Sequence, residues 1–509
     1  MGFKAVAANS LDTVTLPDGF SWKTLVVKRN PLSPATPKFF HATRSTGVAQ
    51  EIQFGDNNDV MQLYTRDGRA VMVANNEHSK RRIPWGTKAS KLPQTEGDVS
   101  KGKASHGLSL FRIRPGGSCW EVVLDATENR HITADTPMDI VGPACGHDLL
   151  KTESAPIALS CSALGTTAAL AARPEAPIRR TRKILTATFS PTTKKWRWPK
   201  GFKRCGISHK DWGDNWAMAD DRCDIAKHPN EPHRAGYVVE IDPFKTSAVP
   251  KKRTAFGRFK HENAEVVIAA DGHIVVDLGD DERGEFLYRF ISTGTYSKGG
   301  NNSNLLKDGE LYAAKFHDGG KGDWLHLPPA TIGMASKADI CIHTRRAVSA
   351  VGATTIDRPE WVAANSHKTE AYCALTNNKN RGKVTNKGGD AVPAVGPNPR
   401  AGNNYGQIVR WRLMGGDHGA TKFAWDLFVI VGSPTVHDDA FAGSQNMFNS
   451  PDGIKHYEAG ILYIQTDGKY SNKGDFAGMC SNQMLATDHE AAAVAAASWS
   501  ARRSVRSQA

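Results

Sequence analysis

The stretch from Val266 to Val276 reads VVIAADGHIVV, and it decides the fold class of this chain. Two short runs rich in β-branched residues flank an Asp-Gly pair, which is a strong hairpin signal because tight turns need residues that accept a positive φ. A second unit of the same form runs from Trp361 through the turn at His367–Thr369 to Leu375. Repeated hairpins of this kind predict an all-β chain, built as a sandwich or a propeller.

Similar runs recur along most of the chain, separated by clusters of Gly, Asp, Asn and Pro. Between them the sequence predicts almost no helix. The expected strands are Leu108–Ile113, Tyr237–Ile241, Val266–Ala269, Ile274–Val276, Phe286–Ile291, Leu311–Phe316, Trp361–Ala364, Ala371–Leu375, Ile408–Leu413, Phe428–Val431 and Ile461–Gln465.

The composition excludes several classes of protein. The chain has 509 residues, of which 39% are hydrophobic and 23% charged, and this excludes a disordered acidic chain, a collagen and a coiled coil. No run approaches the ~20 apolar residues of a membrane-spanning helix. No signal peptide is visible in Met1–Leu16. The eight cysteines form no CxxC pair, and the common nucleotide-binding and hydrolase motifs are absent.

The net charge of +13 raises the hypothesis of a nucleic-acid binder. Two segments supply much of this charge: residues 168–190 carry five basic side chains and one acid, and residues 489–509 carry three and one. A nucleic-acid partner requires the positive residues to lie on one folded face. Because a linker-like stretch and a terminal tail carry so much of the charge, we expect no nucleic-acid partner.

Charged side chains gather on four loops at the ends of expected strands, where functional groups are common. Consecutive acids such as Asp280 and Asp281 suit Ca²⁺ or Mg²⁺, because these ions prefer oxygen ligands. Each loop is also compatible with an ordinary surface turn or a structural salt bridge. The loops are Arg258–Glu262, Gly279–Arg283, Asp357–Trp361 and Ser450–Gly453.

The third loop carries the most specific pattern, Arg358-Pro359-Glu360. Pro359 is expected to stiffen the loop and to push Arg358 into an extended conformation. Residues two apart on an extended segment point to the same side. The Arg358 guanidinium offers a planar fork for a phosphate, and Glu360 offers a metal ligand. Many carboxylates beside one rigid arginine suggest metal-assisted hydrolysis of a phosphoester.

Taken together, blocks along most of the chain resemble the PhoX-type alkaline phosphatases, a bacterial β-propeller family. The shared order of the blocks makes the assignment, since none of them decides it alone. They include TPM at 136–138, GPACGHD at 142–148, GYVVEIDPF at 236–244, RTAFGRFKHE at 253–262, GDDER at 279–283, VGATTIDRPEW at 351–361, LTNN at 375–378, NPRA at 398–401 and SPDG at 450–453.

The resemblance implies one six-bladed propeller domain over residues 1–488 that binds Fe³⁺ and Ca²⁺ and hydrolyses small phosphomonoesters. It also implies a monomer with no membrane span, located in the periplasm or secreted. Arg358 falls where a contact to the substrate phosphate is expected. The implied metal-ligand positions are Glu262, Glu360 and Asp452, with Asp280, Asp281 and Cys161 as further candidates.

The sequence departs from the family at a cysteine that bridges the metals. Counting back from Gly165 places that position on Ser162, one residue beyond Cys161, so the choice between the two stays open. The family continues with two adjacent glutamates in a form like EENFNGYF. This chain instead has RKILTATF at 182–189.

A shift of reading frame accounts for this difference. A DNA string that encodes EENFNGYF, read one base later, encodes RKILTAT, and all seven complete codons agree. We therefore predict that residues 168–190 are translated out of frame. The match also stops near Asp488, and residues 489–509 are predicted to be an out-of-frame or disordered tail.

These departures predict an incomplete metal site and an incomplete last blade. Arg182 and Lys183 stand where the family has carboxylates, and a positive charge repels a cation. The alternative hypothesis is therefore a non-catalytic propeller that acts as a binding module. Metal content and phosphatase activity distinguish the two hypotheses.

Overall fold

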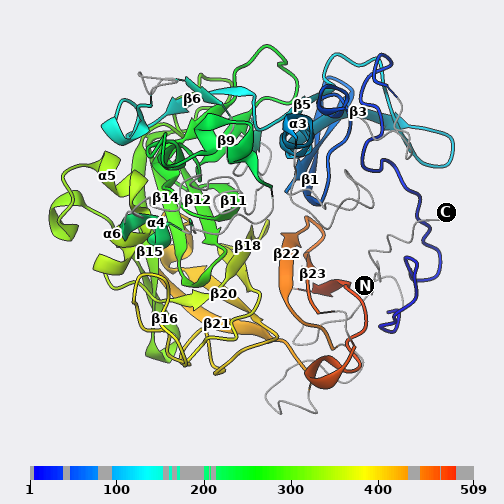
Figure 1. The fold of residues 1–509 in the computed structure, drawn as a ribbon. Helices are drawn as coiled ribbons and strands as arrows, with labels where there is room; N and C mark the ends of the chain where they lie inside the picture. Colours follow the sequence, from blue (N-terminus) through cyan, green and yellow to red (C-terminus); the bar gives the residue numbers. More distant parts are fainter. Residues whose placement is uncertain are drawn as a thin grey trace.

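The computed structural model describes residues 5–37, 46–77, 95–152, 160–162, 169–171, 200–205, 207, 214–433, 447–469 and 472–488. The strands of the described chain form mainly antiparallel sheets that stand around a common centre (Figure 1). This arrangement agrees with the predicted all-β architecture. The expected strands all fall on observed ones, with ends that differ by a few residues.

The first two sheets come from the N-terminal half of the chain and contain five strands each. In the first sheet, β1 to β4 lie side by side in chain order, and β5 pairs with β3. The second has the order β7-β6-β10-β9-β8. Their bounds are β1 Asn58–Arg66, β2 Arg69–Asn76, β3 Gly107–Pro115, β4 Trp120–Val122, β5 Arg130–Ile132, β6 Pro137–Val141, β7 Ser160–Ser162, β8 Ala169–Ala171, β9 Val238–Ile241 and β10 Lys251–Arg253.

The largest sheet has nine strands and consists of two antiparallel units. The units join where β16 pairs with β21, and Gly322 lies opposite Phe423. The predicted Asp271-Gly272 turn connects β11 to β12, with Gly272 at φ +90°. The strands are β11 His261–Ile268, β12 His273–Asp280, β14 Leu287–Thr295, β15 Gly309–His317, β16 Lys321–His326, β18 Pro359–Ala364, β19 Glu370–Leu375, β20 Gln407–Leu413 and β21 Lys422–Ile430.

Two smaller sheets complete the described β structure. A short pair joins β13 (Arg283–Glu285) to β17 (Ile356–Asp357). The last sheet contains β22 (Pro451–His456), β23 (Ile461–Thr466) and β24 (Met484–Asp488). Residues 489–509 and most of 168–190 lie outside the described residues, so the domain limits, the out-of-frame stretches and the incomplete blade stay predictions.

Short helices interrupt the strands, although the sequence predicted almost none. In the described chain, no helix is long and apolar enough to cross a membrane. The α-helices are α1 Gly47–Gln50, α3 Glu96–Ala104, α4 Lys200–Arg204, α5 Lys337–Ile342 and α6 Thr344–Ala350. The 3₁₀ turns are η2 Asp148–Leu150, η3 Trp216–Met218, η4 Asp221–Cys223, η5 Glu231–Arg234, η6 Thr254–Phe256, η7 Asp318–Gly320, η8 Pro329–Ile332, η9 Met414–Gly416 and η10 Gly474–Phe476.

Apolar packing between sheets fixes the centre of the molecule. β18 contacts both β11 and β22. One hydrophobic cluster joins Val60 of β1, Trp361 of β18 and Ile454 of β22. Burial of such side chains stabilises the fold by about 1.5–3 kcal/mol each. The strands that carry the charged loops are thereby held against one another.

Candidate active site

Three buried carboxylates meet at the centre of the molecule. Glu262, Glu360 and Asp452 each offer an oxygen, and these oxygens all lie within 4.8 Å of one another. Each residue is the second of its strand, in β11, β18 and β22 respectively. The structure thus brings together three of the predicted metal-ligand positions.

A β-bulge directs each of these side chains. The pairing of β11 with β12 passes from His261 opposite Asp280 to Ala264 opposite Leu278, so Glu262 and Asn263 together face one residue. The same two-against-one irregularity occurs at Glu360 in β18 and at Asp452 in β22. Bulges re-aim side chains and are common beside active sites.

The side chain of Asn263 fixes the distance between two of the bulges. Its amide donates to the Val362 carbonyl at 2.6 Å, and its oxygen accepts from the Val362 N–H at 2.9 Å. These two bonds link β11 to β18 one residue beyond Glu262. The two glutamates are therefore held by a rigid connection between strands.

The close approach of β12 to β18 requires a glycine at Gly279. A Cβ at this position would lie 2.3 Å from the Glu360 carbonyl oxygen and 2.7 Å from that of Pro359. Both atoms are backbone, which cannot move away as a flexible side chain can. Gly279 therefore allows β12 to lie directly against the bulge that carries Glu360.

The donor set of this cluster fits a hard cation. Glu262 and Glu360 have 0% exposure and Asp452 has 7%. Carboxylates buried side by side repel each other, and burying such charges is costly unless they are paired or bind a metal. Among the described residues the cluster offers three oxygen donors, and such donors suit hard ions such as Ca²⁺ or trivalent iron.

Arg358 supplies positive charge at the edge of the carboxylate cluster. Its Nε donates to Asp281 at 2.6 Å and its Nη2 donates to Glu360 at 3.0 Å. Arg358 and Glu360 therefore lie in contact, as the alternative of a structural salt bridge also predicts. The expected extended conformation is wrong: Arg358 has φ +46°, in the left-handed region. Two buried carboxylates anchor the side chain and offset the cost of this conformation.

Asp280 is held by a different arginine. Arg345 of α6 donates from Nε at 2.7 Å and from Nη2 at 2.5 Å to its two oxygens. Burial raises the pKa of the Tyr288 phenol well above its usual value, so Tyr288 stays protonated and donates to Asp280 at 3.5 Å. Asp280 therefore lies in a buried ion pair, and its neighbour Asp281 fixes Arg358.

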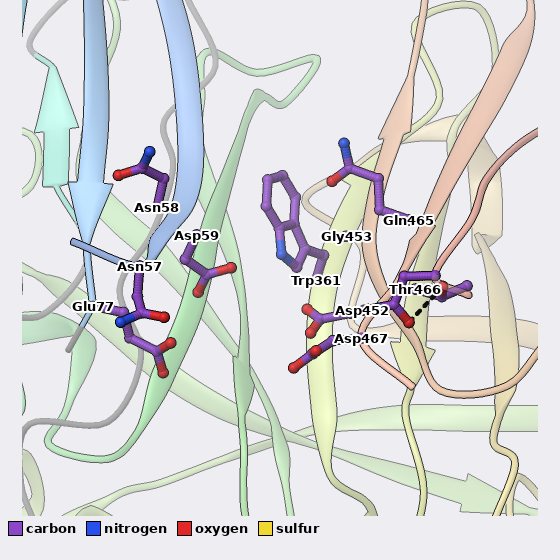
Figure 2. A pocket seen from close by; sticks show the side chains of 11 residues that line it. Asn57, Asn58, Asp59, Glu77, Trp361, Asp452, Gly453, Gln465, Thr466 and Asp467 are labelled. Carbon is purple, nitrogen blue, oxygen red and sulfur yellow. Dashed lines mark hydrogen bonds between the residues drawn. The ribbon is translucent and has the colours of Figure 1, made fainter. Parts of the chain in front are cut away.

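A polar pocket of about 160 Å³ lies beside the cluster, between β1 and β2 on one side and β22 and β23 on the other (Figure 2). Figure 2 shows Asp59 and Glu77 facing Asp452 and Asp467 across it. Its lining residues are Asn57, Asn58, Asp59, Glu77, Trp361, Asp452, Gly453, Gln465, Thr466, Asp467 and Asn482.

Asp59 is a lining residue that the sequence motifs did not indicate. It is the second residue of β1, and the β1–β2 register slips between Asn58 and Met61 as it does at the three other bulges. An acidic residue at the second position of a strand is thus a repeated feature of this chain. This repetition can be recognised only once the strand starts are known, so the sequence alone does not single out Asp59.

The cysteine candidate lies on β7. The backbone of Cys161 pairs with Met138 of β6, and Ser162 pairs with Pro137. Side chains at these positions lie outside the described residues, so the choice between Cys161 and position 162 stays a prediction.

Comparison with known proteins supports the resemblance. The profile of the family described as alkaline phosphatase PhoX matches residues 1–504. The chain is similar to the solved structure of Pseudomonas fluorescens PhoX in complex with vanadate, a transition state analogue: identity is 39%, over 97% of this chain and 88% of that chain, and the TM-score is 0.92. No curated protein sequence matches the chain. The likeness confirms the propeller-like fold, while the blade number stays a prediction.

Proposed function

Because this chain belongs to the PhoX family of alkaline phosphatases, which are metal-dependent phosphomonoesterases, we propose that Glu262, Glu360 and Asp452 hold its catalytic metal ions. The convergence of these three buried carboxylates within 4.8 Å carries the proposal. The family match favours the enzyme over the alternative of a non-catalytic binding module.

We assign Fe³⁺ and Ca²⁺ to this centre. Both are hard cations that prefer oxygen donors, and such ions neutralise a phosphate and activate a nucleophile. Asp280, Asp281 and either Cys161 or position 162 are further candidates. For Asp280 and Asp281, the contacts with Arg345 and Arg358 favour a positioning role.

Arg358 is proposed to bind the substrate phosphate. An arginine has five N–H donors, and the contacts with Asp281 and Glu360 use Nε and Nη2. The Nη1 group then donates to a phosphate oxygen while the two carboxylates hold the plane of the guanidinium. A charge-assisted bond of this kind favours the dianionic phosphomonoester.

The family is typically exported, and we propose that this protein acts in the periplasm or outside the cell as a monomer. Its substrates would then be small phosphomonoesters from which it releases phosphate. Gel filtration of the purified protein tests whether it is a monomer.

Purified protein in which residues 182–189 are restored to the family's EENFNGYF tests the proposed function through three measurements: iron and calcium content, hydrolysis of p-nitrophenyl phosphate at alkaline pH, and inhibition by vanadate. We expect bound metal, hydrolysis that chelators abolish, and competitive inhibition by vanadate. Bound iron and calcium without hydrolysis, in a chain whose residues 182–189 match the family, would contradict the proposal.

Gly279→Ala is expected to lower activity by disturbing Glu360. The added methyl group clashes with the Glu360 and Pro359 carbonyl oxygens, and overpacking of this kind costs about 1–3 kcal/mol. We expect a lower thermal midpoint and at least about a 10-fold loss of kcat/KM, the effect that misplaced metal ligands commonly have. Gly117→Ala is the matched control, because nothing lies within 4 Å of its added Cβ. Equal effects of the two substitutions would contradict the assignment.

A further inference from the structure

Arg258 is a buried cation with unusual partners. Its side chain is 3% exposed. The guanidinium donates to the backbone carbonyls of Ala235 at 3.1 Å, Pro232 at 2.9 Å and Ile342 at 3.3 Å. Its fourth acceptor is the Cys205 sulfur, at 2.9 Å from Nη1.

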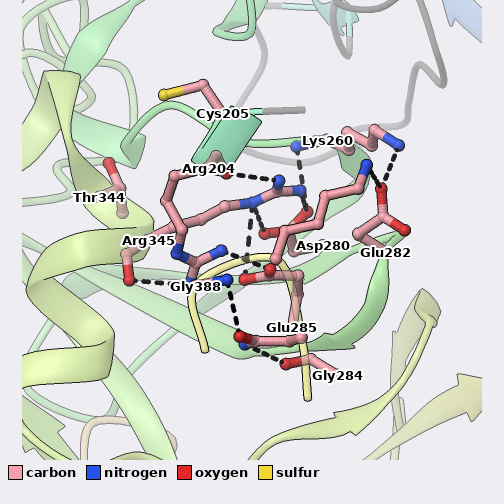
Figure 3. A network of polar contacts seen from close by, with 12 residues as sticks. Arg204, Cys205, Lys260, Asp280, Glu282, Gly284, Glu285, Thr344, Arg345 and Gly388 are labelled. Atoms are coloured by element: carbon pink, nitrogen blue, oxygen red, sulfur yellow. Dashed lines mark hydrogen bonds and ion pairs between the residues drawn. The ribbon is translucent and has the colours of Figure 1, made fainter. Parts of the chain in front are cut away.

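Within the described part of the chain, Arg258 forms no ion pair with a carboxylate, whereas the neighbouring arginines do. Arg204 binds Glu285, and Arg345 binds Asp280 (Figure 3). Carbonyl oxygens supply dipoles but no negative charge. A buried guanidinium without a counter-ion is costly, since buried charges are normally paired. The Cys205 sulfur is the group in contact with Arg258 that can carry the missing negative charge.

Cys205 lies in a setting that favours the thiolate. It follows α4 directly, is half-buried, and also forms a hydrogen bond with His343. Burial by itself raises the pKa of this thiol, but the charge of Arg258 and the hydrogen bonds from His343 and Arg258, with a contribution from Arg345, lower it to about 6.

A further titratable group among the described residues at this point is His233 of η5. Its ring lies 6.0 Å from that of His343 and 5.6 Å from Phe202. Burial and the nearby Arg258 hold the pKa of His233 well below its usual value, so it stays neutral and adds no positive charge. Arg258, His343 and Arg345 are therefore the groups that stabilise the anion.

We propose that Cys205 is a thiolate that serves as the counter-ion of Arg258 and is a site of reversible modification by small disulfides. In this step the Cys205 thiolate attacks one sulfur of a low-molecular-weight disulfide. A mixed disulfide forms, the original disulfide bond breaks, and the second sulfur leaves as a thiolate. The number of thiolates is unchanged, and a free thiol in excess reverses the reaction.

Modification of Cys205 removes the thiolate charge that neutralises Arg258, and this point is linked to residues beside the active site. Arg204, the residue before Cys205, donates to the Arg345 carbonyl at 3.1 Å. Arg345 in turn binds Asp280 (Figure 3). The next residue, Asp281, accepts a hydrogen bond from Arg358. A mixed disulfide at Cys205 is therefore expected to lower thermal stability and activity together.

The test measures how fast an aromatic disulfide, dithiodipyridine, labels Cys205 in the full chain as a function of pH, with each site quantified by peptide mass spectrometry. The exposed Cys145 in the same sample is the standard for reagent reactivity. The midpoint of the pH profile is the readout, because a thiolate of lower pKa is also a weaker nucleophile. We expect a midpoint near 6, against about 8.5 for an ordinary thiol, and a higher midpoint in Arg258→Gln.

A second measurement covers the case in which Arg258→Gln does not fold. The far-ultraviolet thiolate absorbance of the unsubstituted chain, minus that of Cys205→Ser, reports the ionisation of Cys205 directly.

Thermal stability gives a further readout. The pKa of Cys205 is lower in the folded chain than in the unfolded chain, so the stabilisation by the thiolate is present above the unfolded pKa and is lost as pH falls through about 6. The difference in Tm between the two chains should widen from acidic to alkaline pH. A midpoint near that of an ordinary thiol, or no labelling of Cys205 while Cys145 reacts, overturns the proposal.

Discussion

A chain in which Arg182–Phe189 is replaced by the sequence EENFNGYF is expected to bind more iron and calcium and to hydrolyse p-nitrophenyl phosphate at least about 100-fold faster than the chain with RKILTATF. This magnitude exceeds the roughly 10- to 100-fold effect that loss of an outer metal partner has on affinity or activity. The replacement changes two cations, Arg182 and Lys183, into two carboxylates. Activity should rise together with metal content.

The physical reason is the charge around the metal centre. Glu262, Glu360 and Asp452 supply three negative charges, and Arg358 neutralises one of them. A cluster of several di- and trivalent cations needs more anionic ligands than these to be neutral. The resemblance implies two adjacent glutamates after the family's cysteine, and the segment of this chain that is predicted to be out of frame has Arg182 and Lys183 instead.

The matched control carries QQNFNGYF at the same positions. It has the shape of the restored segment without its charge, so it separates the carboxylates from any improvement in folding. We expect little bound metal and little activity in this control. Resequencing of codons 162–192 provides an independent test, in which a single-base insertion or deletion is expected. Equal activity of the restored and control chains would contradict the role of the two carboxylates, and an intact reading frame would contradict the frame-shift explanation.

The sequence located the three central carboxylates but not the way they converge. Glu262, Glu360 and Asp452 were recognisable as acids at strand starts within family blocks. Their meeting depends on β-bulges, and a bulge is a property of two paired strands. A single strand read by itself does not contain the partner register, so this feature required the structure.

The role of the GDDER loop was hidden for a related reason. Asp280 pairs with Arg345, which stands on a short helix that the strand pattern did not predict. Arg358 adopts a positive φ because Asp281 and Glu360 hold its side chain, and these tertiary contacts override the local preference of a residue before proline. Rules based on local sequence predict the conformation of a segment well only where its side chains contact residues that are near in the chain.

Glu360→Gln is expected to remove nearly all activity in the metal-loaded protein, by more than the roughly 100-fold that loss of an outer partner costs. Glutamine keeps the shape of the side chain and can still accept the bond from Arg358. It lacks the negative charge that a hard cation requires. We therefore expect kcat to fall and the bound metal to decrease, as measured by steady-state kinetics and elemental analysis.

Stability of the metal-free protein separates a ligand from a structural residue. Glu360 lies within 4.8 Å of two other carboxylates, so removing its charge relieves repulsion and the apo Tm should stay the same or rise. The stabilisation that added metal gives by binding the folded state should shrink. A structural role alone would instead lower the apo Tm and leave the metal response intact.

Glu370→Gln is the control for Glu360→Gln, because Glu370 is another buried glutamate on the adjacent strand β19. It stands at the opposite end of the β18–β19 pair, where Asn365 and Tyr372 donate to it. Burial raises its pKa, but these hydrogen bonds, with the charges of Arg410 and Arg412, lower it overall. We expect this substitution to reduce stability without reducing the metal content. Loss of metal in Glu370→Gln to the same extent as in Glu360→Gln would show that burial of any glutamate near this strand, rather than coordination by Glu360, explains the effect.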